Sequence, residues 1–282
     1  MKFNKIAIIQ ARFTSSRLPG KVLMDIGGQS MLVRVVERVK QAKTIDNVVV
    51  ATTTDTTDNA VEALCVRHGY PCYRGSNHDV LDRYLQTAKI YNAEVVIRIT
   101  ADCPIIDPHV IDKTVDAFLG KNTGGLELSK SDIVIDADHS PPEFPYDFAA
   151  NRLPPPWGRT YPIGLDTEVC AFQGLELAWK EADLPHQREH VMPFFYDQPD
   201  RFRILHITHD PDYGSLRWTV DTGKDLELLR QIFASFPGRN NFTWLEVLEL
   251  FEQHPEMAQI NAEIKAKNYQ EIDDRSGISP VP

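Results

Sequence analysis

The sequence IAIIQARFTSSRLPGK, residues 6–21, joins a short apolar run to a polar loop. The apolar run, residues 6–9, predicts a buried strand. The loop after it contains three cations, three hydroxyl side chains, one proline and one glycine, and it contains no acid. Loops at the carboxyl ends of strands bind the ligands of α/β sheets, and such a loop suits a polyanion, most simply a nucleoside triphosphate. The alternative is a solvated basic loop that binds no ligand.

Strands and helices alternate through the first half of the chain, which is the pattern of a parallel sheet built from βαβ units. The predicted strands there are residues 5–10, 47–51, 71–73 and 94–99. The predicted helices are residues 30–43, 58–68, 79–91 and 108–119, with Ser30 and Asp107 placed to cap two of them. The second half predicts strands at 165–172, 202–207 and 216–220, and helices at 174–182, 185–196, 224–236 and 243–253.

Length and composition predict one domain. The chain has 282 residues, of which 42% are hydrophobic, and this is enough for one well-buried α/β core. We expect that domain over residues 1–258 and a polar C-terminal segment over 259–282. Between residues 121 and 165 the proline density is too high for a helix or a sheet interior. We therefore expect an irregular excursion there, with one or two edge strands.

Charge and hydropathy exclude several classes of partner. The formal net charge of −10 argues against binding to nucleic acid or to an acidic membrane surface. No stretch approaches the ~18 apolar residues of a membrane span, and the N-terminal residues lack the layout of a signal peptide. We therefore expect a cytoplasmic location, in which the four scattered cysteines are free thiols.

Further segments, taken in order, give the chain a family resemblance. They are YRGSNHDVLDRY, VIRITADCPIIDP, YPIGLDTEV, QREHVMPFFY and LRWTVDTGKDLELL, and with the first loop they span residues 5 to about 235. The set resembles the CMP-sugar synthetase superfamily of cytidylyltransferases, which includes acylneuraminate cytidylyltransferases and CMP-Kdo synthetases. The first loop is most similar to the spore coat polysaccharide biosynthesis protein F group.

The resemblance implies a Rossmann-like three-layer α/β/α fold with a mixed, mostly parallel sheet. It implies a homodimer in which residues 121–165 reach toward the partner subunit. It also implies Mg²⁺-dependent transfer of CMP from CTP to a sugar or sugar-acid acceptor, with release of pyrophosphate, for surface polysaccharide or glycan synthesis. Two alternatives stay open: a nucleotidyltransferase with another nucleotide or a non-sugar acceptor, and a glycosyltransferase or nucleotide-sugar binder of similar fold.

The first loop is the expected nucleotide site. Arg12 and Lys21 would neutralise phosphate charge, and main-chain N–H groups of residues 14–16 would form an anion nest. A Walker A sequence is absent, which disfavours P-loop chemistry. Arg74 is the candidate for contact with the base or ribose, and Asp82 with Arg83 is either a nucleotide-binding pair, by resemblance, or a surface pair. The predicted nucleotide-binding residues are Ala11, Arg12, Thr14, Ser15, Ser16, Arg17, Lys21, Arg74, Asp82, Arg83 and Asp102.

Two carboxylates are the candidate metal ligands. Asp102 follows the strand at 94–99 and Asp221 follows the strand at 216–220, and Mg²⁺ prefers such hard oxygen ligands. The resemblance implies that both bind the metal, although this chain has Thr219 where some relatives have a further acid. The alternatives are that Asp102 caps a turn and that Asp221 caps the next helix. The predicted catalytic residues are Arg12, Lys21, Asp102 and Asp221.

By resemblance, the segment YPIGLDTEV faces the acceptor, and Gly164 permits a close approach of the backbone. The alternative is a structural edge strand. The proline-rich spacer before this segment is longer than is usual in the family, so it leaves the identity of the acceptor open. A zinc site at His186 and His190 is disfavoured because no third ligand is evident. The predicted acceptor-binding residues are Asn151, Arg159, Thr160, Gly164, Asp166, Glu168, Glu189 and His190.

Overall fold

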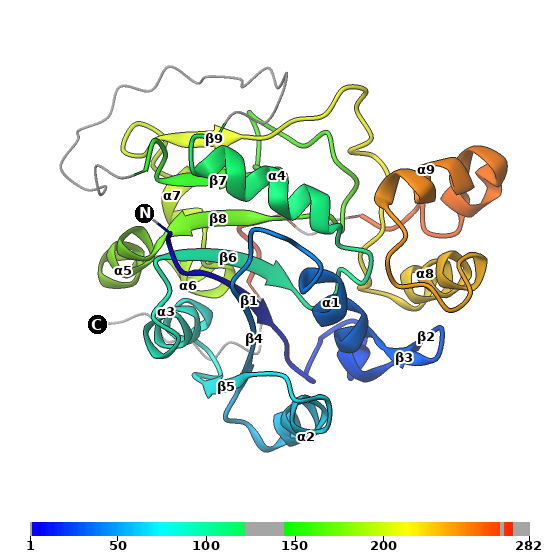
Figure 1. Ribbon diagram of the computed structural model, residues 1–282, viewed down its shortest axis with the longest axis horizontal. Helices are drawn as coiled ribbons and strands as arrows, with labels where there is room; N and C mark the ends of the chain where they lie inside the picture. Colours follow the sequence, from blue (N-terminus) through cyan, green and yellow to red (C-terminus); the bar gives the residue numbers. More distant parts are fainter. Residues whose placement is uncertain (1, 122–143, 266–267, 273–282) are drawn as a thin grey trace.

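A computed structural model describes residues 2–121, 144–265 and 268–272 (Figure 1). Its centre is a seven-stranded sheet in the order β5-β4-β1-β6-β8-β7-β9. Strand β8 runs antiparallel to both of its neighbours, and the other paired strands are parallel. The strands are β1 (Lys5–Gln10), β4 (Asn47–Thr53), β5 (Cys72–Gly75), β6 (Val95–Thr100), β7 (Phe148–Ala150), β8 (Glu168–Ala171) and β9 (Ile204–His206).

Helices cover both faces of the sheet, and this arrangement confirms the predicted three-layer, mostly parallel fold. They are α1 (Met31–Val39), α2 (Asn59–His68), α3 (Val80–Ile90), α4 (Pro108–Phe118), α5 (Phe172–Glu181), α6 (Pro185–His190), α7 (Pro193–Tyr196), α8 (Gly223–Ser235) and α9 (Trp244–Gln253). Short 3₁₀ helices occupy Lys21–Leu23, Thr56–Asp58 and Pro255–Gln259, and a small hairpin joins β2 (Asp25–Ile26) to β3 (Gln29–Ser30).

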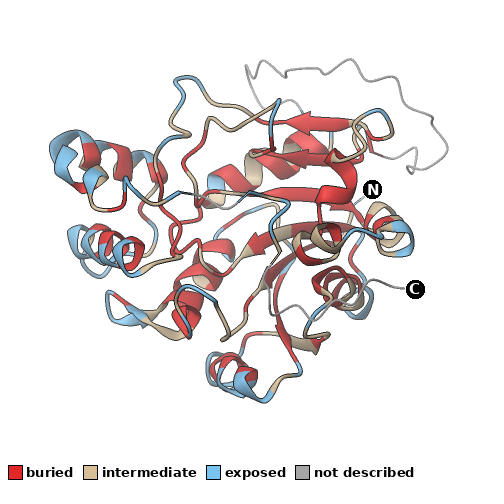
Figure 2. Ribbon diagram, turned by 180° about the vertical axis from the view of Figure 1, so that it is seen from behind, coloured by how far each residue is buried: buried red, intermediate tan, exposed pale blue. Residues whose placement is uncertain are grey.

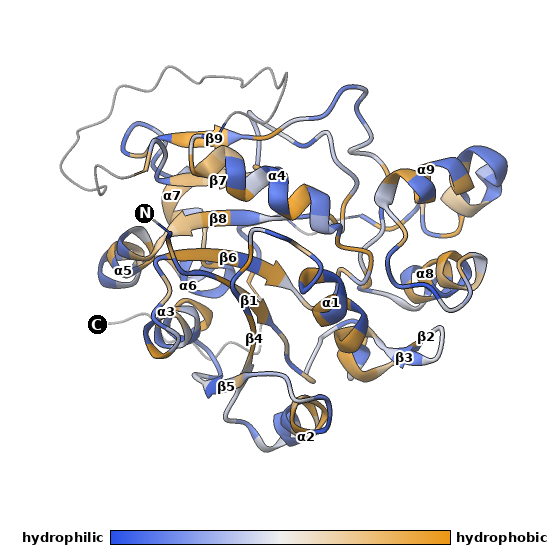
Figure 3. Cartoon of the chain, viewed as in Figure 1, coloured by the Kyte–Doolittle hydropathy of each residue, from blue (hydrophilic) through white to orange (hydrophobic). Residues whose placement is uncertain are grey.

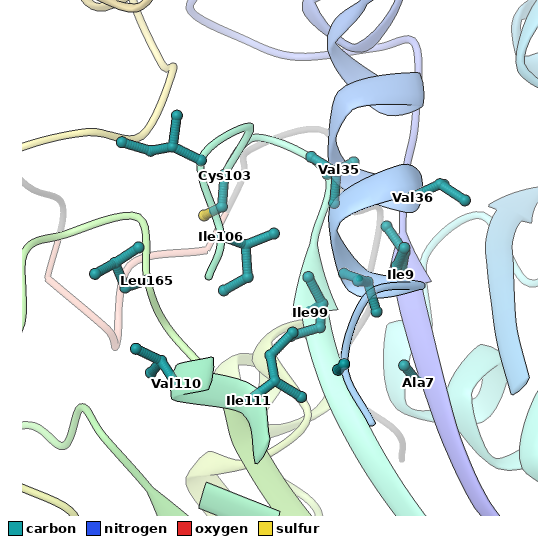
Figure 4. Close-up of a cluster of buried hydrophobic side chains, with 14 of the residues drawn as sticks. Ala7, Ile9, Val35, Val36, Ile99, Cys103, Ile106, Val110, Ile111 and Leu165 are labelled. Carbon is teal, nitrogen blue, oxygen red and sulfur yellow. The ribbon is translucent and has the colours of Figure 1, made fainter. Parts of the chain in front are cut away.

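The alternation of side chains along β1 builds two cores. Ala7 and Ile9 face the core beneath α1 and α4, whereas Ile6 and Ile8 face the core beneath α3 and α5. Figure 4 shows Val35 and Val36 of α1 beside the first of these sets. The strands are buried while the outer turns of the helices are exposed (Figure 2), and β1 and β6 are hydrophobic along most of their length (Figure 3). Strands buried on both faces are typical of parallel sheets.

Most of the predicted elements are present with shifted ends, and β1 has the predicted bounds. Asp107 caps α4 as predicted, since its carboxylate accepts from the N–H of His109 at 2.8 Å. Ser30 precedes α1 as predicted, but its hydroxyl makes no capping hydrogen bond. No helix in the described ranges has the length and apolar character that a membrane crossing requires.

Three predictions of secondary structure are wrong. Residues 216–220 form no strand, because their pairing is limited to a single bridge between Arg217 and Ile163. The strand that the structure describes in the proline-rich segment is not at an edge, since β7 lies between β8 and β9. The helix at 185–196 divides into α6 and α7 because Val191 has a positive φ of 72°. The part of the excursion at residues 122–143 lies outside the described residues.

Candidate active site

The first loop has a defined shape that depends on a distant carboxylate. Gly20 adopts a φ of 73°, and its N–H donates to the carbonyl of Phe13 at 2.8 Å, which closes the loop on itself. The N–H of Phe13 in turn donates to Asp58 at 2.6 Å, and Asp58 is 1% exposed. The second oxygen of that carboxylate accepts the hydroxyl of Thr53 at 2.5 Å. No local sequence pattern indicates this role of Asp58, because it lies 45 residues from Phe13.

Lys21 joins the two predicted metal ligands. Its ammonium donates to Asp102 at 2.9 Å, to Asp221 at 3.0 Å and to the carbonyl of Val220 at 2.7 Å. Burial alone would lower the pKa of Lys21, but the two carboxylates raise it above the ordinary value. Burial likewise opposes the charge of Asp102, and Lys21 overcomes this, so the pKa of Asp102 is lowered. The Lys21 ammonium and the Asp102 carboxylate are therefore both charged.

Asp221 receives two further cations, Arg17 at 2.8 Å and Arg217 at 2.7 Å. It does not cap α8, because Thr222 is the capping residue and forms a reciprocal capping box with Asp225. The alternative role of Asp221 as a helix cap is thus excluded. Instead the carboxylate of Asp221 is directed at the cations of the first loop.

The two carboxylates meet the requirements of a Mg²⁺ site in part. Both carboxylates contact one cation, the Lys21 ammonium, so a positive charge at this position is stabilised by two negative ones. One oxygen of Asp102 has a weaker contact, with the thiol of Cys103 at 3.6 Å. Mg²⁺ is usually held by one or two carboxylates together with phosphate oxygens, and this donor set matches that number. Within the described ranges there is no group of three acidic, histidine or cysteine ligands.

A cavity opens at the carboxyl ends of β1 and β6, as expected for a ligand site of this sheet. It contains most of the predicted nucleotide-binding set. The predicted residues on its wall are Ala11, Arg12, Ser15, Ser16, Arg17, Lys21, Arg83 and Asp102, joined by Asp221 and by Glu189 and His190 of the acceptor set. Three polar wall residues that were not predicted are Gln10, Thr100 and Glu271.

Arg83 is a buried residue of this wall and not part of a surface pair. It is 2% exposed, and burial lowers its pKa to about 10. One of its guanidinium nitrogens donates to the carbonyl of Ser76 at 2.5 Å, while its Nε has no hydrogen-bond partner among the residues that the structure describes. Asp82, its predicted companion, lies outside the cavity wall and accepts from the indole of Trp179 at 2.9 Å. Asp82 therefore joins α3 to α5.

Arg74 and Thr14 also lie outside the walls of the described cavities. The guanidinium of Arg74 donates to the carbonyls of Thr53 and Asp55, at 2.8 and 2.7 Å, and pairs with Glu62 at 2.7 Å. In this arrangement Arg74 ties β5 to the turn after β4. Its contact with a base or ribose stays a prediction.

A second cavity adjoins the first and shares six wall residues with it. The shared residues are Arg17, Thr100, Asp102, His190, Asp221 and Glu271. The predicted acceptor residues Arg159, Gly164, Asp166, Glu168 and His190 lie on its wall, and so do the unpredicted Arg98, Arg152, Tyr196, Thr219 and Tyr269. A Cβ on Gly164 would stand 2.7 Å from the backbone of Trp218, so a side chain does not fit there.

Two of the predicted acceptor residues have structural partners. The amide of Asn151 donates to the carbonyl of Leu165 at 2.8 Å and accepts from the N–H of Thr167 at 2.8 Å. The hydroxyl of Thr160 accepts from the N–H of His209 at 2.6 Å. Neither side chain lies on the wall of the described cavities. They hold the backbone of the segment that does.

Most charged side chains on the wall of the second cavity form ion pairs. Arg98 pairs with Glu168 across the strands β6 and β8, and Arg159 forms two hydrogen bonds to Asp166, at 2.8 and 3.1 Å. Burial opposes the charge of Asp166, but Arg159 and Arg152 lower its pKa. Among the described residues, no carboxylate lies within ion-pair distance of Arg152. Burial alone would lower the pKa of Arg152, yet nearby acids, Asp166 foremost, raise it.

The segment 268–272 completes both cavities. His190 donates from Nε2 to the carbonyl of Glu271 at 2.9 Å, and burial lowers the pKa of His190 to about 4. The ring of Tyr269 packs on Tyr196, with ring centres 5.6 Å apart, and also on His186. This part of the predicted polar segment therefore lies against α6 and α7. Its sequence has no apolar period that would have indicated such packing.

Comparisons with known proteins match the chain to one enzyme family. A family model described as cytidylyltransferase matches residues 6–261. The spore coat polysaccharide biosynthesis protein SpsF of Bacillus subtilis is 30% identical over 258 residues, which cover 89% of this chain and 95% of that protein. A 3-deoxy-manno-octulosonate cytidylyltransferase of Solibacter usitatus is 27% identical over 250 residues, with 82% and 94% covered. A solved cytidylyltransferase structure from Leptospira borgpetersenii has a TM-score of 0.76 and 30% identity, and covers 92% of this chain and 97% of that one.

Proposed function

Because the chain belongs to the cytidylyltransferase family, we propose that it transfers CMP from CTP to a hydroxyl group of a sugar or sugar acid and releases pyrophosphate. The observation that carries this proposal is the arrangement of the two cavities. The first has the cations of the first loop on its wall, and the second meets it at Asp102 and Asp221. A nucleotide in the first cavity and an acceptor in the second would therefore meet at these two carboxylates.

In the proposed reaction, the acceptor oxygen forms a bond to the α-phosphorus of CTP as the bond from that phosphorus to the bridging oxygen breaks. Pyrophosphate leaves with its charge facing the cations Arg12 and Lys21. The acceptor hydroxyl loses its proton to solvent or to a phosphate oxygen. Asp102 and Asp221 would hold Mg²⁺, which when bound supplies charge neutralisation for the phosphates. The protein mainly positions the reactants and stabilises charge, so no covalent intermediate is needed.

The proposal also includes a biosynthetic role and an oligomeric state. The similarity to a spore coat polysaccharide biosynthesis protein supports a role in making a surface polysaccharide or glycan. A homodimer, with residues 121–165 near the partner, is also part of the proposal and has the support of the sequence resemblance.

Selective binding of CTP is the first expected result. Calorimetry with CTP, UTP, ATP and GTP, each with Mg²⁺, should show tight binding for CTP alone. Asp221→Asn should weaken CTP binding in the presence of Mg²⁺ and lower turnover about 100-fold, because it removes one charged ligand of the metal. Lys224→Ala is a matched control, since this exposed lysine pairs with Glu263, lies on neither cavity wall and should leave binding unchanged. Tighter binding of UTP, or wild-type turnover in Asp221→Asn, would contradict the proposal.

The charge of Arg152, which has no ion-pair partner among the described residues, favours an acceptor that carries an acid group. A guanidinium on a cavity wall without a carboxylate partner suits a carboxylate or phosphate of the ligand. The relative from Solibacter usitatus acts on such an acid, 3-deoxy-manno-octulosonate. Arg152→Gln is expected to raise the KM for an acidic acceptor about 10- to 100-fold while the KM for CTP stays the same. Pyrophosphate release measures both, and an equal rise in the KM for CTP would place Arg152 at the nucleotide instead.

A further inference from the structure

The side chain of Gln10 has no partner at the wall of the nucleotide cavity. Its Oε1 is buried and forms no hydrogen bond, and no hydrogen bond between described residues involves its amide nitrogen. Buried polar atoms in native proteins nearly always have a partner, because each one left unpaired is costly. A buried amide oxygen that stays unpaired beside an open cavity therefore indicates a ligand group as its partner.

The position of Gln10 places it next to the reacting end of the nucleotide. It is the last residue of β1, and its strand neighbours are Ala51 on one side and Thr100 on the other. Its carbonyl accepts from the N–H of Ala101 at 3.1 Å, one residue before Asp102. The loop cations come after it in the chain. Gln10 thus lies deeper in the sheet than the phosphate-binding loop and close to the carboxylate expected at the α-phosphate.

The chemistry of the Gln10 amide indicates which part of a nucleotide it would bind. Phosphates are matched by cations, which this loop already provides, so a neutral amide adds little there. A base edge is read only by an amide whose orientation is fixed, and Gln10 has no protein partner among the described residues that would fix it. A ribose hydroxyl both donates and accepts, so either orientation of the amide satisfies it. The ribose also lies between the base and the α-phosphate.

We propose that Gln10 binds a ribose hydroxyl of the nucleotide and makes the site selective for ribonucleotides over deoxyribonucleotides. This inference rests on the proposed function, because it takes CTP as the occupant of the first cavity. It assigns Gln10 a role in substrate binding. The identity of the base is then read by other residues, so the preference for CTP over UTP should not depend on Gln10.

Calorimetry with CTP, 2′-deoxy-CTP and 3′-deoxy-CTP tests the inference on the full chain. Gln10→Met keeps the length of the side chain and removes both polar atoms. It is expected to weaken CTP binding about 10-fold. It should leave the affinity unchanged for whichever deoxynucleotide lacks the contacted hydroxyl, since in a double-mutant cycle the two changes remove one interaction. The ratio of CTP to UTP affinity should stay constant.

Thermal unfolding without nucleotide is the second readout. Because Oε1 is unpaired in the structure, Gln10→Met should unfold at the same or a higher temperature than the wild type. Thr52→Val is a matched control, since it also removes a buried unpaired polar atom but lies on neither cavity wall. It should leave all nucleotide affinities unchanged.

Two sets of results separate the possible failures. If Gln10→Met weakens CTP and both deoxynucleotides equally, changes the ratio of CTP to UTP, or leaves CTP binding intact, the ribose contact is overturned. If the wild-type protein shows no selective binding of CTP, the proposed function itself fails. The second result is obtained without any variant, so the two failures cannot be confused.

Discussion

Lys21→Ala is expected to lower kcat/KM for CTP about 10²- to 10³-fold. A loss of this size is typical when one preorganised hydrogen-bond donor that stabilises developing negative charge is removed. Lys21 is 8% exposed and stands between Asp102 and Asp221, so its removal leaves two carboxylates facing each other. The free energy of unfolding should therefore fall as well, by about 3 kcal/mol, as happens when one partner of a buried ion pair is removed.

Added Mg²⁺ gives this prediction a readout that is independent of turnover. If the two carboxylates can hold a divalent cation, Mg²⁺ should raise the unfolding temperature of Lys21→Ala more than that of the wild type, because it replaces the missing charge. Wild-type kcat/KM in Lys21→Ala would exclude Lys21 from the site. A variant that loses activity but gains no stability from Mg²⁺ would argue against Asp102 and Asp221 as metal ligands.

Glu168→Ala is expected to lower the free energy of unfolding by about 3–5 kcal/mol. Glu168 is 2% exposed and pairs with Arg98, which lies directly opposite on the neighbouring strand. The change leaves a buried guanidinium without its carboxylate. Glu168 was predicted to contact the acceptor, and its ion pair shows that it also joins β8 to β6. Unfolding by denaturant measures the effect, with an unchanged m-value if only stability has changed.

A double variant tests whether stability depends on the ion pair itself or only on leaving no buried charge unpaired. Glu168→Leu combined with Arg98→Met replaces the ion pair by apolar side chains of similar volume, and this should recover most of the stability. Glu181→Ala is the control, since Glu181 pairs with Arg201 in an exposed ion pair and should cost at most about 1 kcal/mol. If Glu168→Ala were as stable as the wild type and had lost only acceptor binding, Glu168 would be a ligand contact and not a link between strands.

The parts of the fold that the sequence predicts are those set by local chemistry. The apolar run of β1, the cap at Asp107 and the helix end at Gly69, which has a φ of 67°, all follow from residues within a few positions of one another. The short loop that holds Arg12, Arg17 and Lys21 is of the same kind. Its residue types indicated a polyanion site before its shape was known.

The parts that could not be predicted depend on contacts between distant segments. Arg38 reads as a polar residue of an amphipathic helix, yet it is fully buried and donates to the carbonyls of Ile106 and Phe242 at 2.7 and 2.8 Å. The predicted strand at 216–220 fails for a similar reason: its apolar residues pack in the core without a partner strand. Asn261, beyond the predicted domain boundary at 258, is 3% exposed and donates to Asp225 at 2.8 Å. No local sequence pattern indicates contacts between residues that lie so far apart in the chain.

The cavities draw their walls from both ends of the chain, and this has a consequence for the order in which the enzyme is made. The loop with Arg12 is translated first, whereas Tyr269 and Glu271 are translated after every helix in the described ranges. A message cut short after α9 would encode the sheet and the loop cations without the wall residues Tyr269 and Glu271.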